Sequence, residues 1–304
     1  MSVISIQSQV AFGHVGFSAA VFPMQMHGID VTAVPTTLLS NRPGYPSIRG
    51  RVLDAQLVAD LLRGVEERGA VDTCEMILSG YLGSPEIAAV VADFVARARA
   101  RNPKLAYCCD PVLGDRDRGL FVPAGIPPLL RDRLCPLADI ITPNHFEFEF
   151  LCGAKAATSG QVIGEAQALM ARGPSTVVVT SAELKDTPDG EIETLAIEPS
   201  EEGFKAWRVR TPKLPISPSG TGDLFAALFV AARVRERTRR MRWATPYPPP
   251  SPCWSALLSA GPRKCASSRA LSCSSARHAG STPSLSAVES RHVARRMGRA
   301  TCPP

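Results

Sequence analysis

A short run near residue 220 combines residue types that could hold a phosphate beside a carboxylate. Gly220-Thr221-Gly222-Asp223, the glycine run, leads directly into the apolar residues 224–230, which favour a helix. Glycine lets the backbone approach a ligand closely, and the first amides of a helix have no partner within the helix. These amides could stabilise a transferring phosphoryl group while Asp223 accepts the proton of an attacking hydroxyl. For Asp223 taken alone, a helix N-cap is the alternative interpretation.

The chain before this run alternates between strand-like and helix-like segments. Strands are predicted at residues 3–6, 31–34, 74–79, 105–109, 138–142 and 177–180. Helices are predicted at residues 17–27, 54–68, 84–101, 126–133, 144–151 and 159–172. Residues 194–197 and 205–209 predict an antiparallel pair. Continuous apolar strands that alternate with helices are typical of an α/β fold whose mostly parallel sheet carries helices on both faces.

Polar residues or glycine follow several of the predicted strands. These positions are Ser8, Gly80, Asp110, Asn144 and Thr180. In open α/β sheets, ligands bind beyond the carboxyl ends of the strands. We therefore expect these residues to line one crevice together with the glycine run.

The composition argues against several classes of protein. No apolar run approaches the ~20 residues that span a bilayer, and the first eight residues do not resemble a signal peptide. The nine cysteines include no C-x-x-C pair, so reduced structural thiols are expected. A P-loop motif is also missing from the sequence. These features predict a cytoplasmic location, with the nucleus as a second compartment, and no membrane partner.

The last quarter of the chain differs in composition from the rest. Residues 235–304 contain thirteen Lys/Arg, two Asp/Glu, nine Pro and twelve Ser. This segment therefore carries +11, and the preceding residues carry −5 of the overall +6. We predict a domain at residues 1–234 and a disordered basic tail at residues 235–304. A frameshift near codons 234–240 is one hypothesis for the tail. Nucleic-acid binding is the other, although the tail has little of the aromatic interleaving that such binding favours.

The glycine run and six further segments together resemble the pyridoxal kinases of the ribokinase-like superfamily. The segments occur in the family's order between residues 3 and 234, namely Ile6-Gln7-Ser8-Gln9-Val10, Gly13-His14-Val15-Gly16, Ser40-Asn41, Ser79-Gly80-Tyr81-Leu82-Gly83, residues 109–115 and residues 142–147. The resemblance implies a three-layer sandwich and ATP-dependent phosphorylation of the 5′-hydroxymethyl group of pyridoxal, pyridoxine and pyridoxamine, in vitamin B6 salvage. It also implies a homodimer.

The resemblance further implies roles for individual residues. Asp223 would be the catalytic base and contact the substrate, and Gly220, Thr221 and Gly222 would form the anion hole. Ser8 would bind the pyridine ring and Tyr81 would pack on it. The alternatives are a serine that caps its own turn and a half-buried aromatic side chain.

On the nucleotide side, the resemblance implies ATP, Mg²⁺ and a monovalent cation, K⁺ or Na⁺. The implied ATP-binding residues are Asp115, Thr142, Asn144, Thr180, Thr221 and Gly222. The implied cation ligands are Asp110, Asp115, Thr142 and Glu147, because hard oxygen ligands suit both ions. Solvated loop acids and, for Glu147, an ordinary acid in the first turn of a helix are the alternatives.

Two features depart from the family's pattern. Pro43 stands where the family often has threonine, and proline offers no side-chain donor and no N–H. The basic tail stands where further helices of the family complete the fold and enclose the adenine. The altered C-terminus leaves a catalytically inactive relative that binds B6 or nucleotide as one alternative function. A hydroxymethylpyrimidine kinase, which shares the Gly-Thr-Gly-Asp helix, is the other.

Overall fold

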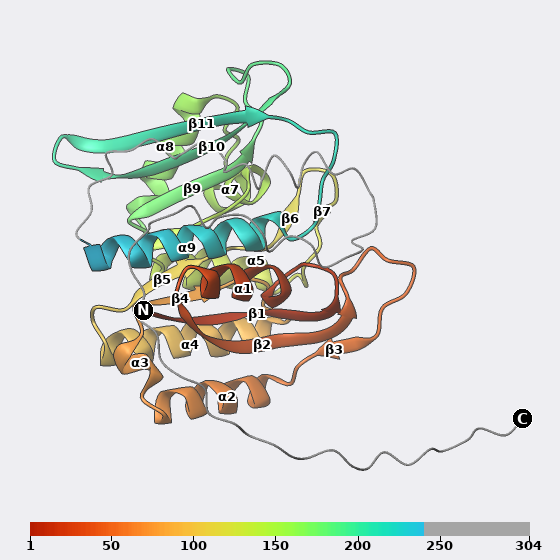
Figure 1. Cartoon of the computed structure of the whole chain (residues 1–304). Helices are drawn as coiled ribbons and strands as arrows, with labels where there is room; N and C mark the ends of the chain where they lie inside the picture. The colour runs from red at the N-terminus through yellow and green to blue at the C-terminus, as the bar shows by residue number, and fades with distance from the viewer. Residues whose placement is uncertain (240–304) are drawn as a thin grey trace, which may run out of the picture. The chain divides into compact units, whose positions relative to one another are not determined.

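The computed structural model describes residues 1–239, which are built around a nine-stranded sheet (Figure 1). Its strands lie in the order β11-β10-β9-β8-β5-β4-β1-β2-β3. Their bounds are β1 Ser2–Phe12, β2 Asp30–Asn41, β3 Gly50–Val52, β4 Met76–Ser79, β5 Ala106–Cys109, β8 Ile140–Ile141, β9 Thr176–Ala182, β10 Glu191–Ser200 and β11 Gly203–Pro212. Strands β9 to β2 pair in parallel, whereas β3, β10 and β11 pair antiparallel at the two edges. A separate hairpin pairs β6 Gly114–Asp115 with β7 Gly119–Leu120.

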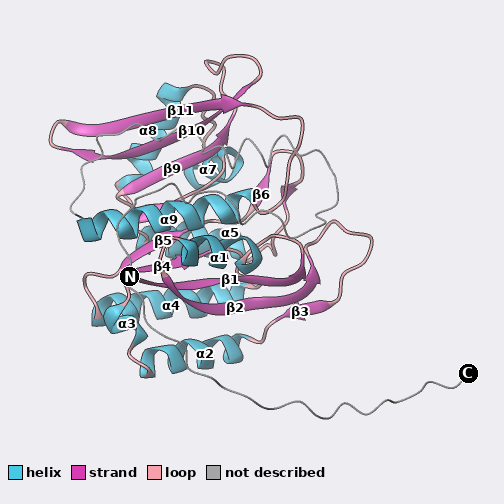
Figure 2. Ribbon diagram, viewed as in Figure 1, coloured by secondary structure: helices cyan, strands magenta, loops and turns pink. Residues whose placement is uncertain are grey.

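Helices lie on both faces of this sheet (Figure 2). Their bounds are α1 Phe17–Met26, α2 Ala55–Glu67, α3 Ala70–Thr73, α4 Pro85–Arg101, α5 Ile126–Leu129, the π-helical turn Leu130–Leu134, α6 Cys135–Leu137, α7 His145–Cys152, α8 Ser159–Met170 and α9 Thr221–Arg239. One apolar core joins the sheet to α2, α4, α5, α7 and α8, and a second joins it to α1 and α9. Alternation along a strand separates the two, since Val3 belongs to the second core and Ile4 to the first. The predicted three-layer α/β arrangement is confirmed.

Two predicted helix starts have the expected local chemistry. The Asp54 carboxylate accepts hydrogen bonds from the amides of Gln56, at 2.9 Å, and Leu57 at the start of α2. Ser84 Oγ accepts from the Ile87 amide at 3.2 Å, with Pro85 in the first position of α4. Both side chains satisfy amides that the helix itself leaves without partners.

Some elements extend beyond their predicted bounds. Strand β2 continues to Asn41 past Pro35, and the register with β1 shifts between Gln7 and Ser8, which leaves Thr36 of β2 as an extra residue. Pairing with β1 thus overrides the low strand preference of proline. Helix α9 continues to Arg239, past the predicted boundary at residue 234, and residues 240–304 of the predicted tail lie outside the described residues. Among residues 1–239, no helix has the length and apolar character to cross a bilayer.

Candidate active site

The glycine run lies where the chain enters α9 and is pressed against the turn after β1. Gly220 has a φ of +86°, and a Cβ there would stand 1.7 Å from the carbonyl oxygen of His14. Any other residue at this position would therefore force the two segments apart. The next residue, Thr221, begins α9 and donates from Oγ1 to the Pro218 carbonyl at 2.7 Å. The backbone of His14 thus has a packing role.

Ser8, the turn before α1 and Asp223 form a contiguous group. A Cβ on Gly16 would stand 2.1 Å from the carbonyl oxygen of Ser8 and 2.5 Å from its Oγ. The Gly16 amide in turn donates a hydrogen bond to the Asp223 carboxylate. Burial raises the pKa of Asp223, and this hydrogen bond partly offsets the rise. Asp223 as a whole residue is half-buried, and a carboxyl group with a raised pKa suits proton exchange with a ligand.

Asp110 follows β5 and is the second carboxylate of the site. It is buried, and it accepts a hydrogen bond from Thr142 Oγ1 at 3.0 Å. Burial and the negative charge of Asp223 raise the pKa of Asp110 to about 7, with the Thr142 hydrogen bond acting in the opposite direction. The expected convergence of Asp110 with Thr142 and Asp223 is therefore present in the structure.

Glu147 is buried beside this pair, but its oxygens are engaged by backbone amides. They accept from Leu113 at 2.9 Å, from Gly114 and from Asn144 at 2.8 Å. Asn144 Oδ1 accepts from the Glu147 amide, which completes a capping box at the start of α7. Burial and the charge of Asp110 nevertheless raise the pKa of Glu147 well above its usual range. Glu147 thus has the contacts of a helix cap, and its raised pKa shows that burial and Asp110 disfavour a second negative charge at this point.

The other predicted nucleotide-side residues are Thr180 near the end of β9, Asn144 at the start of α7, and Asp115 on the separate β6–β7 hairpin. Thr180 donates its amide to the Pro143 carbonyl at 2.9 Å and forms a parallel bridge with Asn144. Asp115 lies on β6, where Arg118 donates to its Oδ2 from Nε at 2.7 Å. Burial raises the pKa of Asp115, but these hydrogen bonds from Arg118 outweigh it and leave the pKa lowered. In this conformation Asp115 pairs with an arginine and is not joined to the Asp110 group.

On the substrate side, the structure adds a residue that the sequence did not single out. Thr36, buried in β2, donates from Oγ1 to the Tyr81 carbonyl at 2.7 Å and so ties the loop after β4 to β2. Tyr81 itself is half-buried, and burial raises its pKa. A strand threonine gives no sequence signal for such a contact, because strand preference alone explains its presence.

The loop that contains Pro43 folds onto the end of β1. The Arg42 guanidinium lies 5.0 Å from the centre of the Tyr45 ring, and Tyr45 meets Phe12 edge-on at 6.0 Å between ring centres. Cation–π and edge contacts of this kind hold a loop in place without the threonine hydrogen bond that Pro43 lacks. The side chains of both Phe12 and Tyr45 are exposed at the surface.

The acids of the site have the charge and donor type that suit a cation. In the described part of the chain, no ion pair involves Asp110, Glu147 or Asp223. Within residues 1–239, no group of three or more His, Cys, Asp or Glu side chains forms a ready metal cage. Mg²⁺ is commonly held by one or two carboxylates together with substrate phosphates, so these residues fit that ion in that manner.

Comparison with known proteins places this chain among small-molecule kinases. Residues 14–241 match the family model described as phosphomethylpyrimidine kinase. A pyridoxal kinase of Leifsonia xyli is 47% identical over 235 residues, which cover 77% of this chain and 82% of the relative. A pyridoxal kinase of Rubrobacter xylanophilus is 48% identical over 231 residues, which cover 76% of this chain and 78% of the relative.

Solved structures show the same similarity. Pyridoxal kinase from Leishmania donovani, in complex with ADP and pyridoxamine, has a TM-score of 0.71 and 34% identity, covering 76% of this chain and 81% of that one. A putative phosphomethylpyrimidine kinase from Bacteroides thetaiotaomicron, in a crystal form with pyridoxal, has a TM-score of 0.69 and 26% identity, covering 77% and 80%. The expected ribokinase-like sandwich is thus confirmed at the level of the fold.

Proposed function

The chain belongs to the pyridoxal kinase family, and from that premise we propose that it transfers the γ-phosphoryl group of ATP to the 5′-hydroxyl of pyridoxal, pyridoxine and pyridoxamine. The observation that carries the proposal is the group formed by Ser8, Gly16, Asp110 and Asp223. It joins a carboxylate of raised pKa to a second carboxylate and to the start of a helix. Phosphoryl transfer needs mainly positioning and charge neutralisation, which such a group supplies.

In the proposed reaction, Asp223 accepts the proton of the substrate's 5′-hydroxyl as its oxygen attacks the γ-phosphorus. The bond from that phosphorus to the bridging oxygen breaks, and ADP leaves with the electron pair. The amides of residues 220–222 at the start of α9 stabilise the charge on the transferring phosphoryl oxygens. Thr221 is a further contact to the nucleotide.

We assign the ring of the substrate to the side of the site formed by Ser8 and Tyr81. Ser8 lies against the Gly16 turn, one hydrogen bond from Asp223, so a ring held by Ser8 would present its substituent to that carboxylate. Tyr81 would cover the ring, with its loop held by Thr36. The family resemblance implies these two roles, and the contacts around Ser8 and Tyr81 support them.

We assign the cations and the nucleotide to the opposite side. Asp110, Thr142 and the charge of Glu147 would hold Mg²⁺ and a monovalent cation, which supply neutralisation of the phosphate charges when bound. Asn144 and Thr180 would line the nucleotide beside them. Asp115 would join only after leaving Arg118. The homodimer and the cytoplasmic location stay proposals that rest on the family resemblance.

A coupled assay of ADP formation with the full chain tests the proposal. Pyridoxal, pyridoxine and pyridoxamine should each give ATP-dependent 5′-phosphate, identified by mass. Hydroxymethylpyrimidine is the second candidate substrate, favoured by the description of the matching family model. Faster turnover of hydroxymethylpyrimidine than of all three vitamers would replace the proposal. Binding of pyridoxal without turnover of either substrate would identify an inactive relative.

A further inference from the structure

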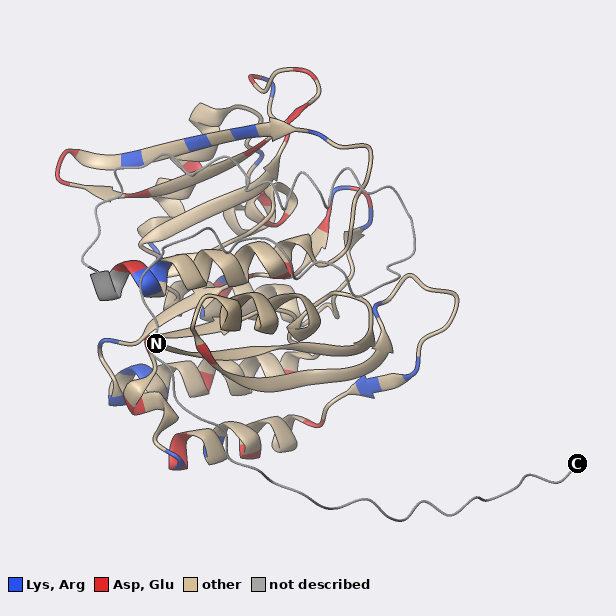
Figure 3. Ribbon diagram, viewed as in Figure 1, with Lys and Arg blue, Asp and Glu red and all other residues tan. Residues whose placement is uncertain are grey.

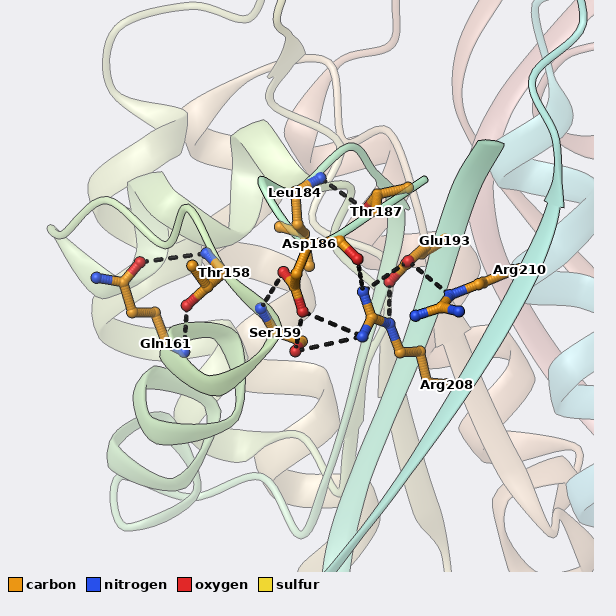
Figure 4. Close-up of polar contacts among 9 residues, drawn as sticks. All are labelled: Thr158, Ser159, Gln161, Leu184, Asp186, Thr187, Glu193, Arg208 and Arg210. Atoms are coloured by element: carbon orange, nitrogen blue, oxygen red, sulfur yellow. Dashed lines mark hydrogen bonds and ion pairs between the residues drawn. The ribbon is translucent and has the colours of Figure 1, made fainter. Parts of the chain in front are cut away.

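A cluster of charged side chains around the buried Glu193 lies at the edge of the sheet beyond β9 (Figure 3, Figure 4). Glu193 on β10 has a fully buried side chain, and Arg208 on β11 donates to both of its oxygens, from Nη2 at 2.7 Å and from Nε. Arg210 adds a third hydrogen bond from Nε at 3.1 Å. The two-pronged contact fixes the orientation of the guanidinium as well as its position.

Arg208 also reaches the loop between β9 and β10. Its Nη1 lies 3.1 Å from Asp186 Oδ2, and its Nη2 donates to the Asp186 carbonyl at 3.0 Å. The Asp186 carboxylate accepts in turn from the amide of Ser159 at 2.9 Å and from its hydroxyl, at the start of α8. One guanidinium therefore joins β11, the 183–190 loop and α8.

The same loop is attached to the segment that leaves β11. Lys213 donates its amide to the Gly190 carbonyl at 2.7 Å, and its Nζ lies 2.6 Å from Glu183 Oε2. From Lys213 the chain runs through residues 214–219 into Gly220, where the anion hole begins. At its other end the loop begins where β9 ends at Ala182, close in sequence to Thr180, a proposed nucleotide contact. Ala182 in turn pairs with Glu193 of β10. The 183–190 loop thus connects β9, which carries Thr180, with the segment that leads to Gly220, and both are proposed to contact the phosphates.

We propose that Glu193, Arg208 and Asp186 form a positioning unit for the nucleotide half of the site. This inference rests on the kinase function proposed above. The cluster fixes the 183–190 loop and, through Lys213, the approach of the chain to the anion hole. Replacing a buried ion pair with apolar residues is often neutral for stability, so stability alone gives little reason for this cluster. Its contacts bind loops together at the carboxyl edge of the parallel strands, where ligands of such sheets lie.

The test compares Arg208→Ala with two controls. Arg97→Ala removes an exposed arginine that pairs with Glu66 at 3.2 Å between α4 and α2. Val91→Ala opens a cavity in the core at α4 and lowers stability without touching the loop. We expect Arg208→Ala to raise KM for ATP about tenfold and to change KM for pyridoxal less than about twofold. Arg208→Lys should recover part of the ATP effect, because it restores the charge without the two-pronged contact.

Equal rises in both KM values, or an ATP effect no larger than that of Val91→Ala at the same loss of melting temperature, would show a role in stability only. If Arg208→Ala does not fold, Asp186→Asn at the accessible end of the cluster replaces it with the same expectation. Binding of a fluorescent ATP analogue to each variant supplies a readout that does not depend on turnover. An inactive wild type that binds this analogue would therefore refute the kinase proposal and still test the positioning role.

Discussion

Residues 1–239 bury carboxylates in two places, and only one of these two provides them with cationic partners. Beyond β5, Asp110 and Glu147 are buried beside Asp223, and the pKa of each of the three is raised by burial. Beyond β9, Glu193 is equally buried but is enclosed by Arg208, and hydrogen bonds from Ser159 lower the pKa of Asp186 to about 2.

The difference separates carboxylates that are available for chemistry from carboxylates that fix the geometry of the chain. An unpaired buried carboxylate costs free energy, and it persists in a fold where a proton or a cation will be handled. A carboxylate enclosed by arginines has its charge satisfied and gives orientation to the chains that carry it.

Asp223→Asn should lower kcat by about 10²–10⁴-fold, because the amide that replaces the carboxylate cannot accept the hydroxyl proton. Steady-state assays with pyridoxal and ATP measure the loss, and binding of both ligands should remain within a few-fold of wild type. Asp93→Asn, an exposed acid on α4, is the matched control and should leave kcat unchanged. A loss of less than tenfold in Asp223→Asn would count against its role as the base.

Glu193→Ala should lower the free energy of unfolding by about 1.5–3 kcal/mol, because Arg208 and Arg210 lose their charged hydrogen bonds to it but still reach solvent. Urea denaturation measures this change. Asp72→Ala removes the acid of an exposed ion pair with Arg101 and should change stability much less, because exposed ion pairs contribute little. Similar losses in the two variants would show that the Glu193 cluster is no more than a surface pair in effect.

The two regions should give opposite pH slopes of stability in metal-free buffer. The folded-state pKa of Asp110 lies above its unfolded value of 3.8, so the folded state binds the extra proton and stability falls as the pH rises from about 4 to about 7. The folded-state pKa of Asp186 lies below that value, so stability falls as the pH drops from about 4 to about 2.

Melting temperatures measured across this range test both slopes. Asp110→Asn should flatten the slope above pH 4 and leave the acid slope, whereas Asp186→Asn should do the reverse. An unchanged upper slope in Asp110→Asn would mean that the acid is ionised at neutral pH without penalty, and the contrast between the two regions would fail at that residue.

Much of the site could be predicted because parallel strands end at one edge. Asp110 and Thr142 directly follow β5 and β8, and Thr180 lies near the end of β9, so strand order alone brings them to the same edge of the sheet. The rest depends on contacts that local sequence does not encode. Glu193 meets Arg208 only through the register of β10 with β11, and an acidic residue in a strand pattern predicts exposure. Asp115 illustrates the same limit, since nothing in its motif indicates a pairing with Arg118.

Thr36 and Thr37 are adjacent buried residues on β2, and changes to their hydroxyls should have smaller effects than the variants above. Thr36 donates to the Tyr81 carbonyl, whereas Thr37 Oγ1 has no hydrogen-bond partner among the described residues. Thr36→Val should raise KM for pyridoxal about 2- to 10-fold, the effect of losing one hydrogen bond that holds the loop over the ring. Thr37→Val should be neutral or slightly stabilising, because it removes a buried hydroxyl that lacks a partner.

Kinetics of both variants with pyridoxal and with ATP provide the measurement. A specific effect on pyridoxal in Thr36→Val, with ATP unchanged, would tie Tyr81 to the substrate through its backbone contact. Equal effects in both variants would mean that β2 tolerates neither change, since the two side chains are equally buried and differ only in whether the hydroxyl is paired. In that case, whether a buried hydroxyl has a hydrogen-bond partner would not indicate its role in this site.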